Sequence, residues 1–83
     1  MRGKMKIDLI LYASLTRFVP GSVAGDVIQL EIQPKATVND VLRQMGLPTD
    51  ISLILLINGK SGVKSQELHE NDRLAVFPTI AGG

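Results

Sequence analysis

Apolar and polar residues alternate along two stretches of the chain, which is the period of two expected of a half-buried strand. Residues 5–12 alternate apolar side chains with Lys6 and Asp8. Residues 28–33 place apolar side chains on one face and amide or carboxylate side chains on the other. Pro34 follows, and it ends the second strand because proline has no N–H to donate to a sheet.

The period then changes to that of a helix. Within residues 38–45 the apolar positions fall at i, i+3, i+4 and i+7, which makes one apolar stripe. Thr37, followed three positions later by Asp40, resembles a capping box. Gly46 supplies a residue that tolerates left-handed backbone angles, and Pro48 prevents the helix from resuming. The pattern predicts a short amphipathic helix.

The remaining segments predict further strands. Residues 51–57 are almost wholly apolar, which is typical of a buried strand, and Asn58-Gly59 directly after them is a strong signal for a tight turn. A short strand or turn is expected through residue 64, and residues 73–77 predict the last strand. Between the first two strands the segment is too long for a tight hairpin.

One amphipathic helix can cover only one face of a sheet, so these elements favour a two-layer α+β domain. A ferredoxin-like fold would need a second helix, and residues 65–72 are too short and too polar to form one. The best fit is a β-grasp fold, a mixed four- to five-stranded sheet packed on one main helix. Residues 1–79 are expected to form this single small domain, and residues 80–83 a flexible Gly-Gly tail.

The face of the sheet away from the helix is expected to be unusually apolar. Alternation sends five large side chains outward: Ile10, Tyr12, Ile54, Leu56 and Phe77. In a β-grasp the first and last strands are central neighbours, so these side chains would form one patch of the kind that marks a protein contact. Alternatively, a bulge breaks the alternation and some of these side chains enter the core.

Composition excludes several kinds of chemistry. Nine basic and eight acidic residues leave a net charge of +1 without any charge run, so we expect no nucleic-acid partner. The chain has no cysteine and a single histidine, His69, in a polar segment. We therefore expect no catalytic residues and no metal site. Asp8 interrupts the apolar run near the N-terminus, which argues against a signal peptide, and we expect a cytoplasmic protein that does not enter a membrane.

The sequence ends on Gly82 and Gly83. A terminal carboxylate has a pKa of about 3.5, so it is ionised at neutral pH and must be activated before a nucleophile can attack it. Because glycine has no Cβ, a Gly-Gly segment can pass through a narrow enzyme channel. Many chain ends simply fray, and composition alone favours that interpretation.

The last thirteen residues, NDRLAVFPTIAGG, carry a family resemblance. They resemble the C-terminal signature of the MoaD/ThiS sulfur carriers, which are ubiquitin-like β-grasp proteins, and they are most similar to the molybdopterin synthase small-subunit branch. The resemblance implies that a ubiquitin-activating-type enzyme adenylates Gly83 with ATP. A persulfide donor then converts it to a thiocarboxylate, while Ile80, Ala81 and Gly82 lie in the partner's channel. The docking residues would be the five outward side chains of the sheet.

In that branch the resemblance further implies a molybdopterin synthase large subunit as the acceptor, with no cofactor bound tightly by this chain. Three alternatives stay open at this stage. The chain could be a ubiquitin-like modifier that is joined to lysines, a thiamine-pathway sulfur carrier, or a β-grasp interaction module with an inert tail.

Overall fold

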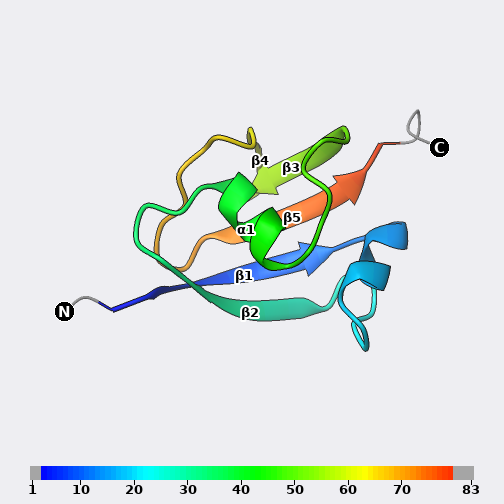
Figure 1. Ribbon diagram of the computed structural model, residues 1–83, viewed down its shortest axis with the longest axis horizontal. Helices are drawn as coiled ribbons and strands as arrows, with labels where there is room; N and C mark the ends of the chain where they lie inside the picture. Colours follow the sequence, from blue (N-terminus) through cyan, green and yellow to red (C-terminus); the bar gives the residue numbers. More distant parts are fainter. Residues whose placement is uncertain (1–2, 80–83) are drawn as a thin grey trace.

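The computed structural model describes residues 3–79. The chain forms a five-stranded mixed sheet in the order β2-β1-β5-β3-β4, and α1 lies across one face of it (Figure 1). The elements are β1 (Met5–Leu11), a 3-10 helix η1 (Ala13–Phe18), β2 (Val27–Ile32), α1 (Val38–Gln44), β3 (Leu53–Ile57), β4 (Lys60–Ser61) and β5 (Arg73–Pro78).

The central strands β1 and β5 run parallel, and the other neighbouring pairs run antiparallel. A parallel pair of first and last strands, with one helix between the second and third strands, is the β-grasp arrangement. The prediction of an α+β fold with a four- to five-stranded sheet on one helix is confirmed. Because β1 and β5 are parallel, their C-terminal ends lie at the same end of the sheet. From there the chain continues from β5 to Thr79.

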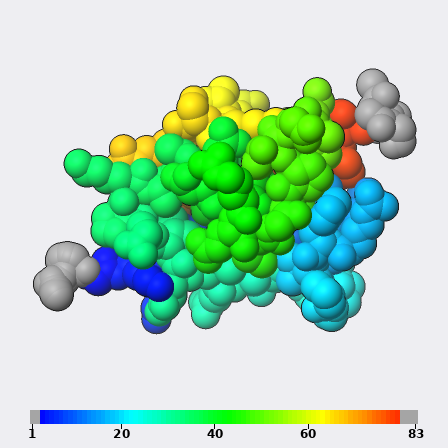
Figure 2. Space-filling view, in the orientation of Figure 1, coloured from blue at the N-terminus to red at the C-terminus, as the bar shows by residue number. Residues whose placement is uncertain are grey.

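The core lies between the sheet and α1. Val38, Val41 and Leu42 of α1 are completely buried, and they belong to the same cluster of buried residues as Leu9 and Leu74 from the two central strands. Figure 2 shows this side of the molecule, where side chains of α1 and of the segment after it cover the sheet. The apolar stripe predicted from the 3.6-residue period is therefore the buried side of the helix.

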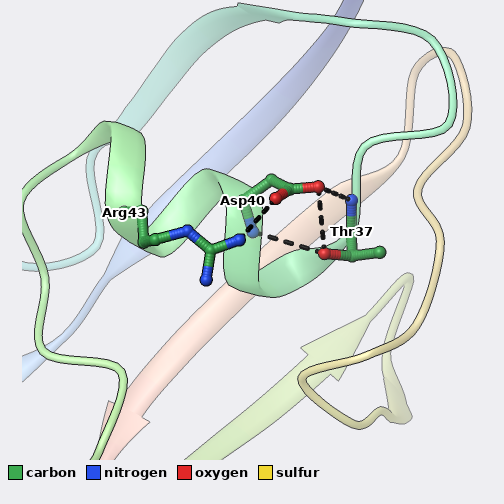
Figure 3. Close-up of polar contacts among 3 residues, drawn as sticks. All are labelled: Thr37, Asp40 and Arg43. Atoms are coloured by element: carbon green, nitrogen blue, oxygen red, sulfur yellow. Dashed lines mark hydrogen bonds and ion pairs between the residues drawn. The ribbon is translucent and has the colours of Figure 1, made fainter.

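The start of α1 is fixed by the predicted capping box (Figure 3). The backbone N–H of Asp40 donates to Oγ1 of Thr37 at 3.3 Å, and the backbone N–H of Thr37 donates to Oδ2 of Asp40 at 2.9 Å. Arg43 donates to Oδ1 of Asp40 at 2.6 Å. The hydrogen bonds from the Thr37 backbone and side chain, helped by Arg43, lower the pKa of Asp40. The capping box thus gives hydrogen-bond partners to two backbone N–H groups at the start of α1, and it stabilises the ionised carboxylate of Asp40.

The turn predicted at Asn58-Gly59 is also present, between β3 and β4. Both residues have left-handed backbone angles, with φ of 54° at Asn58 and 83° at Gly59. Two consecutive positive φ values are required by the type I′ turn that suits a right-twisted hairpin.

Two parts of the core carry weaker sequence signals. The segment after β1 forms η1, whose Leu15 is buried and whose Phe18 packs against the core. Leu68 is fully buried although it lies in the polar segment 65–72. Its backbone N–H donates to the carbonyl of Ala36 at 2.8 Å, which holds this segment against the residues that precede α1.

Candidate functional site

The face of the sheet opposite α1, called here the open face, holds the candidate site. Strand register decides which side chains share it. Ile10 of β1 is paired with Val27 and with Ala75, and Ala75 is paired with Leu56. Phe77 is paired with Ile54 in the next row. The pairings of β1, β3 and β5 run without interruption, so no bulge reverses the alternation in these strands. The side chains predicted to point away from the helix lie on that side of the sheet: Ile10, Ile54, Leu56 and Phe77.

The two aromatic residues form the best-defined contact of the open face. The rings of Tyr12 and Phe77 stack with centroids 4.3 Å apart and planes 3° from parallel. The backbone N–H of Tyr12 donates to the carbonyl of Val76, which ties the end of β1 to β5. Both residues are half-buried, so part of each side chain is accessible to solvent. A stacked, half-buried aromatic pair suits a binding anchor, because each ring has few rotatable bonds to fix on contact.

The exposed area of this face is distributed unevenly among the predicted docking residues. Ile54 is 49 % exposed and Leu56 is half-buried. Ile10 lies on the open face by register, yet it is only 7 % exposed and contributes little surface. It is also absent from the core cluster between sheet and helix, which agrees with its position on the other side. A docking role for these three residues, as for Tyr12 and Phe77, stays a prediction.

Sequence reasoning missed two members of this surface. Val27 is 49 % exposed and lies beside Ile10, and Ala75 lies between Ile10 and Leu56. Extending the alternation of the second strand backward by one residue would have found Val27. We call these side chains together the apolar patch; its members are Ile10, Tyr12, Val27, Ile54, Leu56, Ala75 and Phe77.

A polar region borders the apolar patch toward the start of β5. Asp8 and Arg73 are register partners, and their side chains form an ion pair at 3.6 Å. Asn58 donates to Asp72 and accepts from the backbone N–H of Arg73, both at 2.9 Å. The open face is thus polar at the start of β5 and apolar at its end, the end from which the chain proceeds toward residues 80–83.

The predicted tail residues Ile80, Ala81, Gly82 and Gly83 lie outside the described residues, and their roles stay predictions. The last described residue, Thr79, is half-buried, and its hydroxyl donates to the carbonyl of Ser52 at 3.5 Å. Within residues 3–79 no cluster of histidine, aspartate and glutamate side chains is arranged to hold a metal ion. In the same part of the chain no helix is long and apolar enough to cross a membrane.

A mixed sheet on one helix, with parallel first and last strands, defines a ubiquitin-like β-grasp protein. More narrowly, residues 4–82 match the family model described as Mut7-C ubiquitin, and the chain belongs to that family. A search of curated proteins by sequence finds no significant match.

Solved structures support the fold. The Haloferax volcanii HVO 2177 protein is similar with a TM-score of 0.78 and 26 % identity, over 100 % of this chain and 91 % of that one. Small archaeal modifier protein 1 of H. volcanii has a TM-score of 0.70 and 20 % identity, over 92 % and 99 % of the two chains. A candidate molybdopterin converting factor subunit 1 from Pyrococcus furiosus has a TM-score of 0.70 and 18 % identity over the same shares. The β-grasp fold that the terminal resemblance implies is thus shared with these structures.

Proposed function

We propose that this chain is a sulfur carrier that uses Gly83 as the attachment point, and that its sulfur serves molybdopterin synthesis with the chain as synthase small subunit. Three observations support the proposal: the Gly-Gly sequence, the ubiquitin-like family and the fold shared with a candidate molybdopterin converting factor subunit 1. The observation that carries it is the stacked pair of Tyr12 and Phe77, which lies on an open apolar face at the end of the strand that leads to the glycines.

The chemistry follows from the terminal group. A free carboxylate at Gly83 is ionised at neutral pH and resists nucleophiles. In the proposed cycle an adenylating partner joins it to AMP and releases pyrophosphate from ATP. A persulfide sulfur then attacks the acyl carbon and displaces AMP, and cleavage of the sulfur–sulfur bond by a reductant leaves the thiocarboxylate. The chain has no cysteine, so a separate protein must supply the persulfide.

Docking through the open face would explain how the terminal residues reach a partner's site. Fixing the four residues from Ile80 to Gly83 costs roughly 4–8 kcal/mol of backbone entropy. Burying about 250 Å² of apolar surface returns about 6 kcal/mol, which is comparable. Val27, Ile54 and the half-buried aromatic pair offer exposed apolar surface for this purpose. The folded domain would therefore contribute binding, and the partner would contribute the reacting groups.

The proposal is tested by reconstitution with the adenylating enzyme and persulfide donor of the same cell. The chain ending at Gly83 should support ATP–pyrophosphate exchange and then gain the mass of one oxygen-to-sulfur exchange. A chain that lacks Gly83 should do neither while unfolding at the same temperature, because a terminal residue contributes almost nothing to the core. Sulfur transfer to the shortened chain would refute the assignment of Gly83.

A second candidate function is that of a ubiquitin-like modifier joined to lysines of other proteins. The fold shared with small archaeal modifier protein 1 favours it, and the two functions use the same adenylated intermediate. They differ in the final acceptor. Isopeptide-linked conjugates in extracts of the native cell, absent when Gly83 is removed, would identify the modifier, whereas a thiocarboxylate without conjugates would identify the carrier.

A further inference from the structure

The outer edge of β2 is the longer of the two edges of the sheet. β2 spans Val27–Ile32, and the opposite edge strand, β4, has only the two residues Lys60–Ser61. Within residues 3–79 no other strand pairs with the outer side of β2. Proteins usually protect such edges with a bulge, an internal proline or a lysine. β2 has no bulge, because its pairing with β1 is continuous, and it contains neither proline nor lysine; its one charged side chain is Glu31.

Existing hydrogen bonds determine which backbone groups point outward. The N–H of Asp8 donates to Asp72 and the carbonyl of Lys6 accepts from Asn71, so alternate residues of β1 face the β5 side. The residues between them face β2, and their register partners there are Ile28, Leu30 and Ile32. It follows that Val27, Gln29 and Glu31 direct their N–H and carbonyl groups toward the outer edge.

A contact from the helix confirms this direction. Nε2 of Gln44 donates to the carbonyl of Glu31 at 3.2 Å, which requires that this carbonyl point away from β1. Among residues 3–79 this is the one side-chain hydrogen bond to the outer edge of β2. The groups of Val27 and Gln29 keep the spacing of a strand that accepts a further strand, about 6.6 Å between alternate residues.

The side chains of β2 on both faces of the sheet give this edge apolar surface and negative charge. Val27 is exposed on the open face, while Ile28 and Leu30 are only partly buried on the helix side. Asp26 and Glu31 are exposed at the two ends of the strand, and residues 26–33 contain no basic residue. A strand added here would find apolar contacts at its centre and a carboxylate near each end.

We propose that the outer edge of β2 binds an extended peptide segment of a partner protein, with apolar residues at its centre and a basic residue near each end. The segment adds a sixth strand through main-chain hydrogen bonds to Val27 and Gln29, the mode known as β-augmentation. The site is separate from Thr79, the last described residue, because β2 is an edge strand and Thr79 follows the central strand β5. It therefore does not depend on sulfur transfer.

The test uses the full chain labelled with nitrogen-15 and a capped peptide with the sequence lysine-valine-threonine-valine-threonine-lysine. Amide shifts on titration should concentrate at residues 27–31. The same peptide with every backbone amide N-methylated keeps its side chains and charges, and it should bind at least about tenfold more weakly because its donors are gone. A peptide with glutamate at both ends should also bind more weakly, by an amount that shrinks at high salt.

Two variants at one position separate backbone from side-chain binding. Gln29→Pro removes an outward N–H, whereas the bonds to β1 are made by the flanking residues, so an edge strand can accept it. This variant should weaken peptide binding roughly tenfold, and Gln29→Ala should leave it nearly unchanged. If Gln29→Pro does not fold, the N-methylated peptide still tests whether binding depends on main-chain hydrogen bonds.

Three results would overturn the proposal. The first is that the N-methylated peptide binds as tightly as the unmethylated peptide. The second is that amide shifts centre on Phe77 and Leu56, while residues 27–31 stay unaffected at peptide concentrations up to the solubility limit. The third is self-association of the chain, measured by sedimentation, that protects the amides of Val27 and Gln29 from exchange, because a second copy would then occupy the edge.

Discussion

Replacement of Phe77 by alanine tests the open face as a docking surface. Phe77 is half-buried, stacks on Tyr12 and is paired with Ile54. A fully buried phenylalanine costs about 3–5 kcal/mol on truncation to alanine, and an aromatic pair contributes about 0.5–1.5 kcal/mol beyond its buried area. Since Phe77 is only partly buried, we expect Phe77→Ala to lower the free energy of unfolding by less than a core phenylalanine would, by about 1–2 kcal/mol. In a domain of this size each 1 kcal/mol lowers Tm by about 4–8 °C.

Binding should change more than stability. An aromatic anchor at the centre of an interface commonly loses about 2 kcal/mol or more on truncation, which is about thirtyfold in affinity. The assay pairs urea unfolding with a titration of the adenylating enzyme, on the same protein and corrected for the folded fraction. Val76→Ala is the matched control, because Val76 is the neighbouring residue on the buried face. It should cost about 2–3 kcal/mol of stability and leave affinity per folded molecule unchanged.

Phe77→Ala should lower affinity more than stability, and Val76→Ala should lower stability alone. If Phe77→Ala lowers stability as much as Val76→Ala and leaves affinity unchanged, the ring acts as part of the core. The open face is then not the docking surface.

Three further substitutions test other parts of the structure. Thr37→Ala removes the N-cap of α1 and should destabilise the chain by about 1 kcal/mol in thermal unfolding. Because the folded-state pKa of Asp40 is lowered, its contribution to stability is complete above the usual pKa of 3.8 and is lost as the pH falls through the lower folded value. The difference between the parent and Asp40→Asn should therefore shrink over that acidic range, and a constant difference would contradict the linkage. Gly59→Ala forces an alanine to φ of 83°, so it should cost about 1 kcal/mol or more, whereas Gly3→Ala, with open space around it, should cost almost nothing. Gly82→Ala should block adenylation in the exchange assay while Tm stays at the parent value, and normal turnover would contradict the narrow-channel interpretation.

Local patterns were sufficient to predict the fold and which side chains share the face of the candidate site. The period-two alternation of β1 and the 3.6-residue stripe of α1 each reflect burial on one side, so the sequence records them directly. The capping pair of Thr37 and Asp40 is a local signal as well, because both hydrogen bonds lie within one turn. The outward direction of Phe77 followed from the same alternation.

Exposure within that face could not be predicted in the same way. Ile10 points outward as alternation requires, but how far its neighbours cover it depends on the register with β2 and β5, which pairs it with Val27 and Ala75. Leu68 shows the converse case. Its local surroundings are polar, and it is buried because residues distant in sequence, including Ala36, hold its backbone against the core. Long-range contacts of this kind leave no periodic signal in the sequence.

The intact mass of the protein purified from its native cell tests the central claim most directly, with the Gly83-deleted chain expressed in parallel. The sulfur-carrier account predicts a fraction that ends at Gly83 and carries one oxygen-to-sulfur exchange there, located by fragmentation to the terminal residue and absent from the deleted chain. The contradicting result, in sulfur-replete cells, is a chain ending at Gly83 that carries an unmodified carboxylate throughout, or one whose glycines are joined by ordinary peptide bonds to further residues.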